Sequence, residues 1–350
     1  MRNRGRSSLL ALTGVMALAG VACGEDGSGS SSSSGGTSAG GELVLYSGRD
    51  EELVAPLIDA FEEQSGIDVE VRYGNSAELG AALLEEGGNT PADVVYSQEV
   101  GALGVLSDND LLSPLPTQVV DLVDDRFAPA EGTDWVGVTG RSRVLVVNPE
   151  VVGEVPDSVD DLTDPQYREQ IGWAPSNASF QAFVTAFRVS QGEGPAAGWL
   201  DAMVANEPQT FESNSDILEA VDSGELGIGL INHYYWARMV PEVGGVDNMG
   251  SELVFLQGED PGALVNATAV AVTTKGEANP AALEFVEYLL SDEGQTYFVE
   301  ETWEYPLVDG IADPEGLPAL DDLAGPRLDL ADLDSLEATI TLLTDKGLLG

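Results

Sequence analysis

The apolar residues that follow position 42 alternate between strand spacing and helix spacing. A short apolar run at 43–46 predicts a strand, and apolar positions repeated every three or four residues over 53–61 predict a helix. Residues 67–73 alternate between apolar and polar, as a half-buried strand does. A second helical pattern covers 79–84, and another strand pattern follows at 92–96. This β-α-β-α-β series predicts a parallel sheet flanked by helices.

The same alternation continues through the rest of the chain. Apolar runs predict further strands at 143–147, 171–174, 226–231 and 267–273. Helical spacing predicts helices around 180–187, 217–221, 280–290 and 293–299. The body from residue 42 onward is long enough for two domains, so we expect an α/β protein with two such units.

The first 41 residues have a different character. Residues 1–22 contain three arginines and an apolar run that is too short to cross a bilayer, which is typical of a signal peptide. Cys23 follows small residues, as at a bacterial lipoprotein site, although Gly20 stands where such sites usually carry leucine. The alternative is an ordinary secretory signal followed by an unpaired thiol. Residues 23–41 are rich in Gly and Ser and predict a flexible tether. We expect an exported protein, at the cell surface or in the periplasm, with a lipid anchor at Cys23.

The charge of the chain excludes one large class of partner. The chain has 61 acidic and 14 basic residues, which gives a formal net charge of −47. Because this charge would repel the phosphates of a nucleic acid, we expect no nucleic-acid binding. An excess of carboxylates is typical of a solvated surface in salty surroundings, so it does not by itself indicate a cation site.

Four polar segments follow predicted strands at their C-terminal ends. They are Ser47–Glu51, Ser97–Glu99, Ser176–Ser179 and Asn232–Tyr235. Ligands of open α/β sheets bind outside the carboxyl ends of the strands. Two sheets that face each other would form a cleft there, so we expect these segments to line one ligand site.

Seven stretches, in their order along the chain, resemble the ferric-ion-binding proteins of bacterial ABC uptake systems. They cover about residues 42–310 and read LVLYSGRDEE, ADVVYSQEVGALG, GRSRVLVVN, GWAPSNASFQAFVTA, FESNSDILEAV, GLINHYYWAR and NATAVAVTT. The resemblance implies a type 2 periplasmic-binding-protein fold, in which two α/β lobes enclose a cleft and are joined by two crossing strands near residues 138 and 266. The predicted lobes are 42–138 plus 266–350, and 139–265.

The stretch GLINHYYWAR holds the only histidine of the chain and two adjacent tyrosines. The resemblance implies that Tyr234 and Tyr235 are ligands of Fe³⁺. A hard trivalent cation prefers anionic oxygen, and bound metal favours the deprotonated form of a phenol whose free pKa is near 10. The alternative is that one tyrosine belongs to the core and the other covers the surface. We interpret His233 as a supporting or structural residue, because many relatives carry another residue at this place.

The other metal ligands match the family less closely. Asp50 stands where relatives often have a histidine, and Gln98 stands where some have a glutamate, with Glu99 next to it. Val147 stands where other relatives supply a third tyrosine. The resemblance therefore implies two tyrosines and a carboxylate from Asp50 or Glu99, with an external anion or water completing the shell. The alternative for each carboxylate is an ordinary surface residue.

The resemblance also implies a synergistic anion, carbonate or phosphate, at the start of a helix. Free N–H groups and the helix dipole favour negative charge there. The matching positions are Ser176, Asn177, Ala178, Ser179, Asn214 and Asn232. Helix capping by Ser176 or Asn177 is the alternative, and both roles can hold together. The scarce positive charges of Arg49, Arg141 and Arg143 would balance the anion or the carboxylates, or form structural salt bridges.

The function predicted from these features is that of a monomeric extracytoplasmic solute-binding protein. It would capture ferric iron between two lobes and deliver it to an ABC transporter permease. The alternative is the same fold with another solute, such as a polyamine, thiamine, a phosphonate or an oxyanion. We expect no enzyme, because the chain has no nucleophile elbow, no cysteine nucleophile beyond the signal, and no motif around its one histidine.

Overall fold

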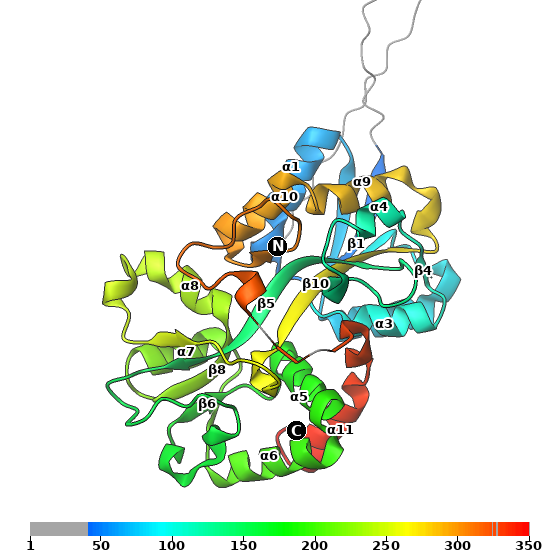
Figure 1. Ribbon diagram of the computed structural model, residues 1–350. Coiled ribbons are helices and arrows are strands. Elements are labelled where there is room, and N and C mark those ends of the chain that lie inside the picture. Colours follow the sequence, from blue (N-terminus) through cyan, green and yellow to red (C-terminus); the bar gives the residue numbers. More distant parts are fainter. Residues whose placement is uncertain (1–40, 324, 327, 350) are drawn as a thin grey trace, which may run out of the picture. The chain divides into compact units, whose positions relative to one another are not determined.

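Two strands, β5 and β10, connect the two halves of the molecule (Figure 1). The computed structural model describes residues 41–323, 325–326 and 328–349, so the predicted signal peptide, Cys23 and nearly all of the tether lie outside the described residues. β5 (Val136–Val147) pairs antiparallel with β10 (Val265–Thr273) through its first part and with β8 (Ile228–Asn232) through its second part. β5 therefore belongs to both halves of one sheet.

The sheet has the strand order β2-β1-β3-β10-β5-β8-β6-β7, and three short strands lie off this path. Its other strands are β1 (Glu42–Ser47), β2 (Asp68–Tyr73), β3 (Val94–Ser97), β4 (Leu112–Ser113), β6 (Ile171–Trp173), β7 (Gln209–Thr210), β9 (Glu252–Val254) and β11 (Tyr305–Pro306). β1 pairs in parallel with β2 and β3, and β6 pairs in parallel with β7 and β8. These pairings confirm the predicted α/β class.

The helices pack around three groups of buried apolar residues, one in the first half of the molecule and two in the second. The first half, lobe 1, contains α1 (Glu51–Ser65), α2 (Ser76–Glu86), α3 (Gly101–Asp108), α4 (Thr117–Val120), α9 (Pro280–Leu289) and α10 (Asp292–Tyr297). The second half, lobe 2, contains α5 (Ala178–Gln191), α6 (Glu193–Ala205), α7 (Asn214–Asp222) and α8 (His233–Glu242). Because the core of the first half is separate from the two cores of the second, the packing agrees with a two-lobed fold.

The last helix, α11 (Leu336–Asp345), lies on the core of lobe 2, although its residues fall within the predicted first lobe. Leu343 is fully buried in that core, and Thr339 exchanges a hydrogen bond of 2.7 Å with Thr185 of α5. The preceding short helix, residues 330–334, packs against α3 of lobe 1. The C-terminal segment therefore contacts both lobes. For the rest of the chain, we propose that the boundaries between the two lobes lie after residues 138 and 265.

The start of α5 shows how the sequence positions the ligand site. Asn177 has an extended backbone, and its side-chain oxygen accepts a hydrogen bond from the N–H of Ser179, which caps the helix. Phe180, Phe183 and Phe187 recur at helical spacing and are buried, with the rings of Phe180 and Phe183 5.7 Å apart in an edge-on contact. Burial of this stripe fixes the helix, so the residues before it are held at the end of β6.

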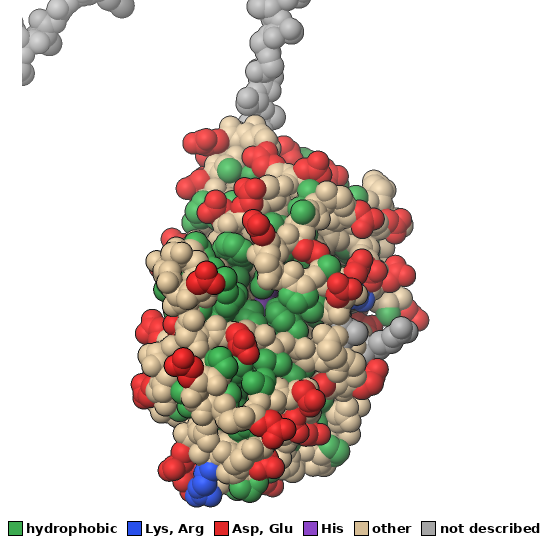
Figure 2. All heavy atoms as spheres, turned by 60° about the vertical axis from the view of Figure 1, so that its left-hand side comes forward, with side chains coloured by type: hydrophobic (Ala, Val, Ile, Leu, Met, Phe, Trp, Pro, Cys, Tyr) green, Lys and Arg blue, Asp and Glu red, His purple; other side chains and the backbone are tan. Residues whose placement is uncertain are grey.

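No helix in the described part of the chain combines the length and the apolar character that a membrane span requires. The space-filling view shows acidic side chains over much of the surface and few basic ones (Figure 2). Three of the scarce arginines are instead buried. Arg49, Arg141 and Arg143 each have at most 3% of their surface exposed. Buried charges need partners, so these arginines indicate where the polar interior lies.

Candidate metal and anion site

Arg143, on the second part of β5, is the centre of a buried polar cluster. Its Nη1 donates to Ser179 Oγ at 3.1 Å and to the side-chain oxygens of Asn214 and Asn232, each at 3.4 Å. Its Nη2 donates to the carbonyl of Leu230 at 2.7 Å. Three residues that the sequence assigned to an anion site therefore meet around one guanidinium group.

Asn177 joins this cluster as well as capping α5. Its Oδ1 accepts from the backbone N–H of Ser179 at 3.0 Å, from Ser179 Oγ at 2.6 Å and from Asn214 Nδ2 at 3.3 Å. Ser176 is exposed, and its carbonyl accepts a hydrogen bond of 3.3 Å from Gln181. Capping therefore falls to Asn177, and Ala178 is the first residue of the helix.

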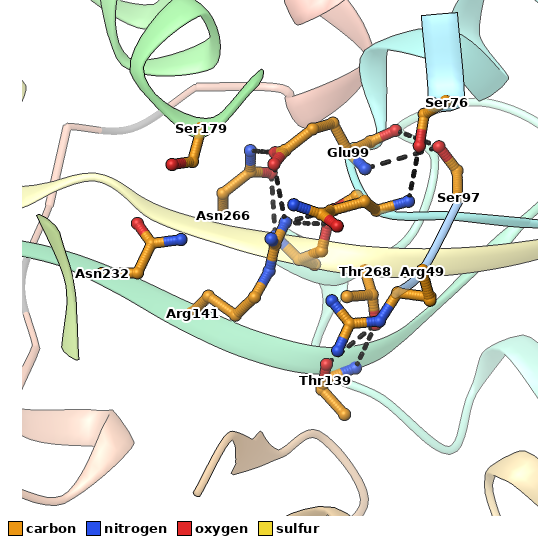
Figure 3. A network of polar contacts seen from close by, with 12 residues as sticks. Arg49, Ser76, Ser97, Glu99, Thr139, Arg141, Ser179, Asn232, Asn266 and Thr268 are labelled. Atoms are coloured by element: carbon orange, nitrogen blue, oxygen red, sulfur yellow. Dashed lines mark hydrogen bonds and ion pairs between the residues drawn. The ribbon is translucent and has the colours of Figure 1, made fainter. Parts of the chain in front are cut away.

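Arg141 lies two residues before Arg143, so both side chains leave the same face of β5. Arg141 forms an ion pair of 3.1 Å with Glu99, and the side chain of Asn266 also donates to Glu99. Figure 3 shows Arg141 directed toward Glu99 and Asn266, with Ser179 and Asn232 on the opposite side. Burial raises the pKa of Glu99, while the charge of Arg141 opposes this rise.

A void of about 10 Å³ lies between these groups. Its lining residues are Glu99, Arg141, Arg143, Ser179, Asn232, Leu264 and Asn266. The Nε of Arg143, and the Nε and Nη1 of Arg141, are buried without a hydrogen-bond partner among the described residues. Burial lowers the pKa of Arg143 to about 10, which means that its charge is incompletely compensated. The cluster therefore offers positive charge and N–H donors to an anion, beside the partly compensating carboxylate of Glu99, in a void with about the volume of one water molecule.

Arg49 forms a second buried ion pair behind this cluster. Its Nη2 lies 2.9 Å from both carboxylate oxygens of Glu304, and neither side chain is exposed. Glu304 also accepts from Thr139 and Thr302, each at 3.2 Å, and lies 4.0 Å from Arg141. Burial by itself would lower the pKa of Arg49, but the acidic groups around it, with Glu304 foremost, together raise this pKa above its usual range. Glu304 was not predicted as a site residue, although an acid between Trp303 and Tyr305 is an unusual neighbour for aromatic residues.

Tyr234 and Tyr235 lie in the first turn of α8 rather than in a turn after the strand. Their rings stack with centroids 4.4 Å apart, Tyr234 is buried, and Tyr235 is half-buried. Burial raises the pKa of the Tyr234 phenol well above its ordinary value, and the nearby guanidinium groups of Arg141 and Arg49 oppose this rise. Tyr234 is therefore protonated at neutral pH.

His233 connects three segments at the start of α8. Its Nδ1 accepts from the N–H of Ser142 on β5 at 3.1 Å, so its Nε2 carries the proton and donates to the carbonyl of Trp303 at 2.8 Å. Its ring lies 4.8 Å from that of Tyr305 and 5.9 Å from that of Tyr234. Because both nitrogens are occupied within the protein, His233 supports the tyrosine turn structurally.

We expect His233 to make the folded protein sensitive to acid. Burial lowers the pKa of His233 to about 4, from an ordinary value of 6.5. Between these two pH values the unfolded chain binds a proton at His233 that the folded chain does not, so the free energy of unfolding falls as the pH falls. The loss is about 3 kcal/mol over this window.

Urea denaturation at pH 7 and at pH 4.5 measures this effect. The matched variant is His233→Gln, which keeps an acceptor and a donor but does not titrate in this range. The difference in unfolding free energy between the two proteins should shrink as the pH falls, because the acidic residues contribute equally to both. Parallel pH profiles would show that His233 is not the cause.

The other positions considered for the metal shell lie in different surroundings. Asp50 is exposed at the N-terminus of α1, and its side chain makes no capping hydrogen bond. The carbonyl of Gln98 accepts from Arg141, and the N–H of Gln98 donates to Ser76 Oγ at 2.9 Å. Val147 is buried in the sheet. The described residues contain no group of three or more His, Cys, Asp or Glu that could hold a metal ion.

Comparisons with known proteins agree on one kind of relative. A family model described as bacterial extracellular solute-binding protein matches residues 56–324. The major ferric iron-binding protein of Neisseria meningitidis serogroup B is 33% identical over 310 residues, which covers 88% of this chain and 93% of that protein. The Fe(3+)-binding periplasmic protein of Serratia marcescens is 32% identical, with 88% and 90% covered.

Solved structures give the same result. Iron-bound HitA from Pseudomonas aeruginosa matches with a TM-score of 0.81 and 32% identity, which covers 88% of this chain and 99% of that one. The Trichodesmium protein IdiA (FutA), in complex with iron and citrate, matches with a TM-score of 0.71 and 25% identity, and 88% and 100% are covered.

Proposed function

This chain belongs to the family of bacterial extracellular solute-binding proteins, and from this premise we propose that it captures ferric iron between its lobes. It is accordingly a solute-binding protein and not an enzyme. The observation that carries the proposal is the adjacent pair Tyr234 and Tyr235, in the first turn of a helix that begins beside the buried arginines. Relatives named for ferric iron at 32–33% identity support the choice of metal.

Tyr234 and Tyr235 would supply two phenolate ligands. Binding Fe³⁺ displaces the phenolic protons, because the charge of the metal stabilises the phenolate more than burial destabilises it. A third ligand would come from Asp50, which is exposed and free of a capping contact, or from Glu99. Glu99 would first have to exchange a contact with Arg141 or Asn266.

An anion would complete the site beside the metal. The buried charges of Arg49, Arg141 and Arg143 exceed those of Glu99 and Glu304 by one, which favours an additional negative group. The unpartnered nitrogens of Arg141 and Arg143 and the amide and hydroxyl groups around them are suitable donors. We propose that carbonate or phosphate binds here, where Asn177, Ser179, Asn214 and Asn232 converge.

Delivery to an ABC permease is the proposed fate of the iron. Closure of two lobes over a ligand produces a shape that a permease can distinguish from the open form. A lipid on Cys23 and the Gly/Ser tether would hold this protein, as a monomer, near its permease. Release would follow when the lobes open and the anion leaves.

An oxyanion or a phosphonate without iron is the second candidate, because the arginine cluster alone can bind such a ligand. Polyamines and thiamine are cations that, unlike Fe³⁺, would not displace the phenolic protons of the two tyrosines, so the excess of buried arginine charge disfavours them.

A visible absorption spectrum tests the proposed function. We expect a broad blue-green band to grow as ferric citrate is added in bicarbonate buffer, and to stop growing at one equivalent, because tyrosinate transfers charge to Fe³⁺. Phosphate or sulfate without iron should give no band. A colourless titration with iron would overturn ferric binding through the tyrosines and leave the anion as the ligand.

A further inference from the structure

A chamber of about 320 Å³ lies next to the polar cluster and is walled by helices from distant parts of the chain. Figure 1 shows α3, α5 and α11 converging on one side of the crossing strands. The fourth wall is α2. On α2 the lining residues Ala77, Ala81 and Leu84 recur at helical spacing, so a single face of that helix is turned to the chamber.

The walls of the chamber are mostly apolar and small, and the polar residues among them are Asn75, Ser76, Glu99, Gln181, Thr185 and Glu337. Alanines from α2, α3 and α5 leave the central space open, and larger apolar residues stand at the rim. Leu84 of α2 is 40% exposed and Ile340 of α11 is 39% exposed, although both are large and apolar. The remaining apolar lining is Gly80, Gly101, Ala102, Val105, Ala178, Ala182, Leu333 and Leu336.

The C-terminal wall is fixed to both lobes. Arg188 of α5 donates to Thr339 Oγ1 at 2.7 Å and to the carbonyl of Ser335 at 3.0 Å. On the other side, a Cβ placed on Gly104 of α3 would lie 2.8 Å from the carbonyl oxygen of Ala331, so that backbone approaches α3 closely. The chamber is thus bounded by anchored structure.

The chamber meets the polar cluster at Glu99 and at the start of α5. Glu99 lines both the chamber and the small void that contains Arg141 and Arg143, and Ala178 lines the chamber one residue before Ser179 lines the void. The void provides guanidinium nitrogens without partners, and the chamber provides apolar walls. A ligand that reaches from one to the other needs an anionic end and an apolar body.

We propose that the chamber holds the apolar body of an organic ferric chelate, with the oxygen ligands of that chelator directed toward the arginine-lined void. The inference rests on the proposed function. The chelator class is a small bidentate oxygen acid, such as an α-hydroxycarboxylate, that carries an aryl or branched alkyl group. A cavity of about 150 Å³ holds benzene, so a phenyl group fits in this chamber. The void of about 10 Å³ is too small for such a body.

Lactate and mandelate form a matched pair of probes. Both acids carry the same α-hydroxycarboxylate group and the same charge. Lactate has a methyl group where mandelate has a phenyl group. The protein is titrated with Fe³⁺ in the presence of each acid, and the tyrosinate band is followed. We expect half-saturation at an iron concentration at least about tenfold lower with mandelate, because the phenyl group is buried in apolar surroundings.

Variants that fill the chamber should remove this preference. Ala81→Phe and Ala77→Phe place a ring inside from α2, and both alanines are at least partly exposed, so the helix tolerates the larger side chain. The matched control is Ala338→Phe, at an exposed position of α11 that does not line the chamber. The two α2 variants should bind iron equally with either acid, and the control should keep the preference.

The outcomes separate the two proposals. If both acids give the band with equal half-saturation, the proposed binding of an apolar group in the chamber is wrong, and ferric binding stands. The same holds if mandelate is preferred but the preference survives both α2 variants. No band with either acid overturns ferric binding, and this inference with it. A preference that only the α2 variants remove supports both.

Discussion

Replacing both Tyr234 and Tyr235 with phenylalanine should abolish the visible band and weaken ferric binding by about a thousandfold or more. Phenylalanine keeps the ring contacts, the stack between the two side chains and the edge contact with His233. It removes only the two oxygens that the proposal assigns to the metal. The affinity is measured by competition with a chelator of known strength, and the fold by circular dichroism.

Tyr305→Phe is the matched control. Tyr305 is buried 4.8 Å from the ring of His233, but its hydroxyl donates to the carbonyl of Pro318 at 2.9 Å and so points elsewhere. This variant should keep the band and the affinity. If the double variant at 234 and 235 still gave the band, the iron would be held by other oxygens and the proposed ligand pair would be wrong.

Glu304→Gln should give the largest loss of stability among single substitutions around the site, about 3–5 kcal/mol. The substitution leaves Arg49 buried with an uncompensated charge, and a neutral amide replaces the carboxylate that also accepts from Thr139 and Thr302. Arg141 lies 4.0 Å from the same carboxylate, so we also expect weaker ferric binding. Chemical denaturation gives the stability, and the tyrosinate band gives the binding.

Glu207→Gln provides the comparison on the surface. Glu207 pairs with Arg168, and both side chains are about half exposed, at 53% and 51%. Water and salt screen such a pair, so the loss should stay below about 1 kcal/mol. Equal losses at positions 304 and 207 would contradict the interpretation that burial gives the Arg49–Glu304 pair its importance.

The longer strands, about half of the helices and the meeting of the polar segments were predictable because they depend on local patterns. Period-two and helical spacing give the elements, and parallel strands bring their carboxyl ends to one edge of a sheet. For this reason the segments around Ser179 and Asn232, which are more than fifty residues apart in the sequence, were expected at one site and meet at Arg143.

Other features depend on contacts that no local pattern encodes. Glu304 pairs with Arg49 across 255 positions of the chain, and in a chain of 61 acidic residues a single glutamate carries little information. The two hydrogen bonds of His233 lead to Ser142 and Trp303, which only the folded chain brings together. The packing of α11 on lobe 2 was not predictable either, because the pattern of its apolar residues does not show which lobe they contact.

The positions of Arg141 and Arg143 on one face of β5 have a mechanical consequence. Arg141 pairs with Glu99 and donates to the carbonyl of Gln98 on the side of lobe 1, whereas Arg143 donates to Asn214 and Asn232 in lobe 2. A bend of β5 between these two residues changes the separation of their guanidinium groups. An anion that touches both is therefore bound more tightly at one interlobe angle than at others, and by reciprocity the anion biases that angle. A permease that bends this strand would reduce the affinity for the anion without touching the metal.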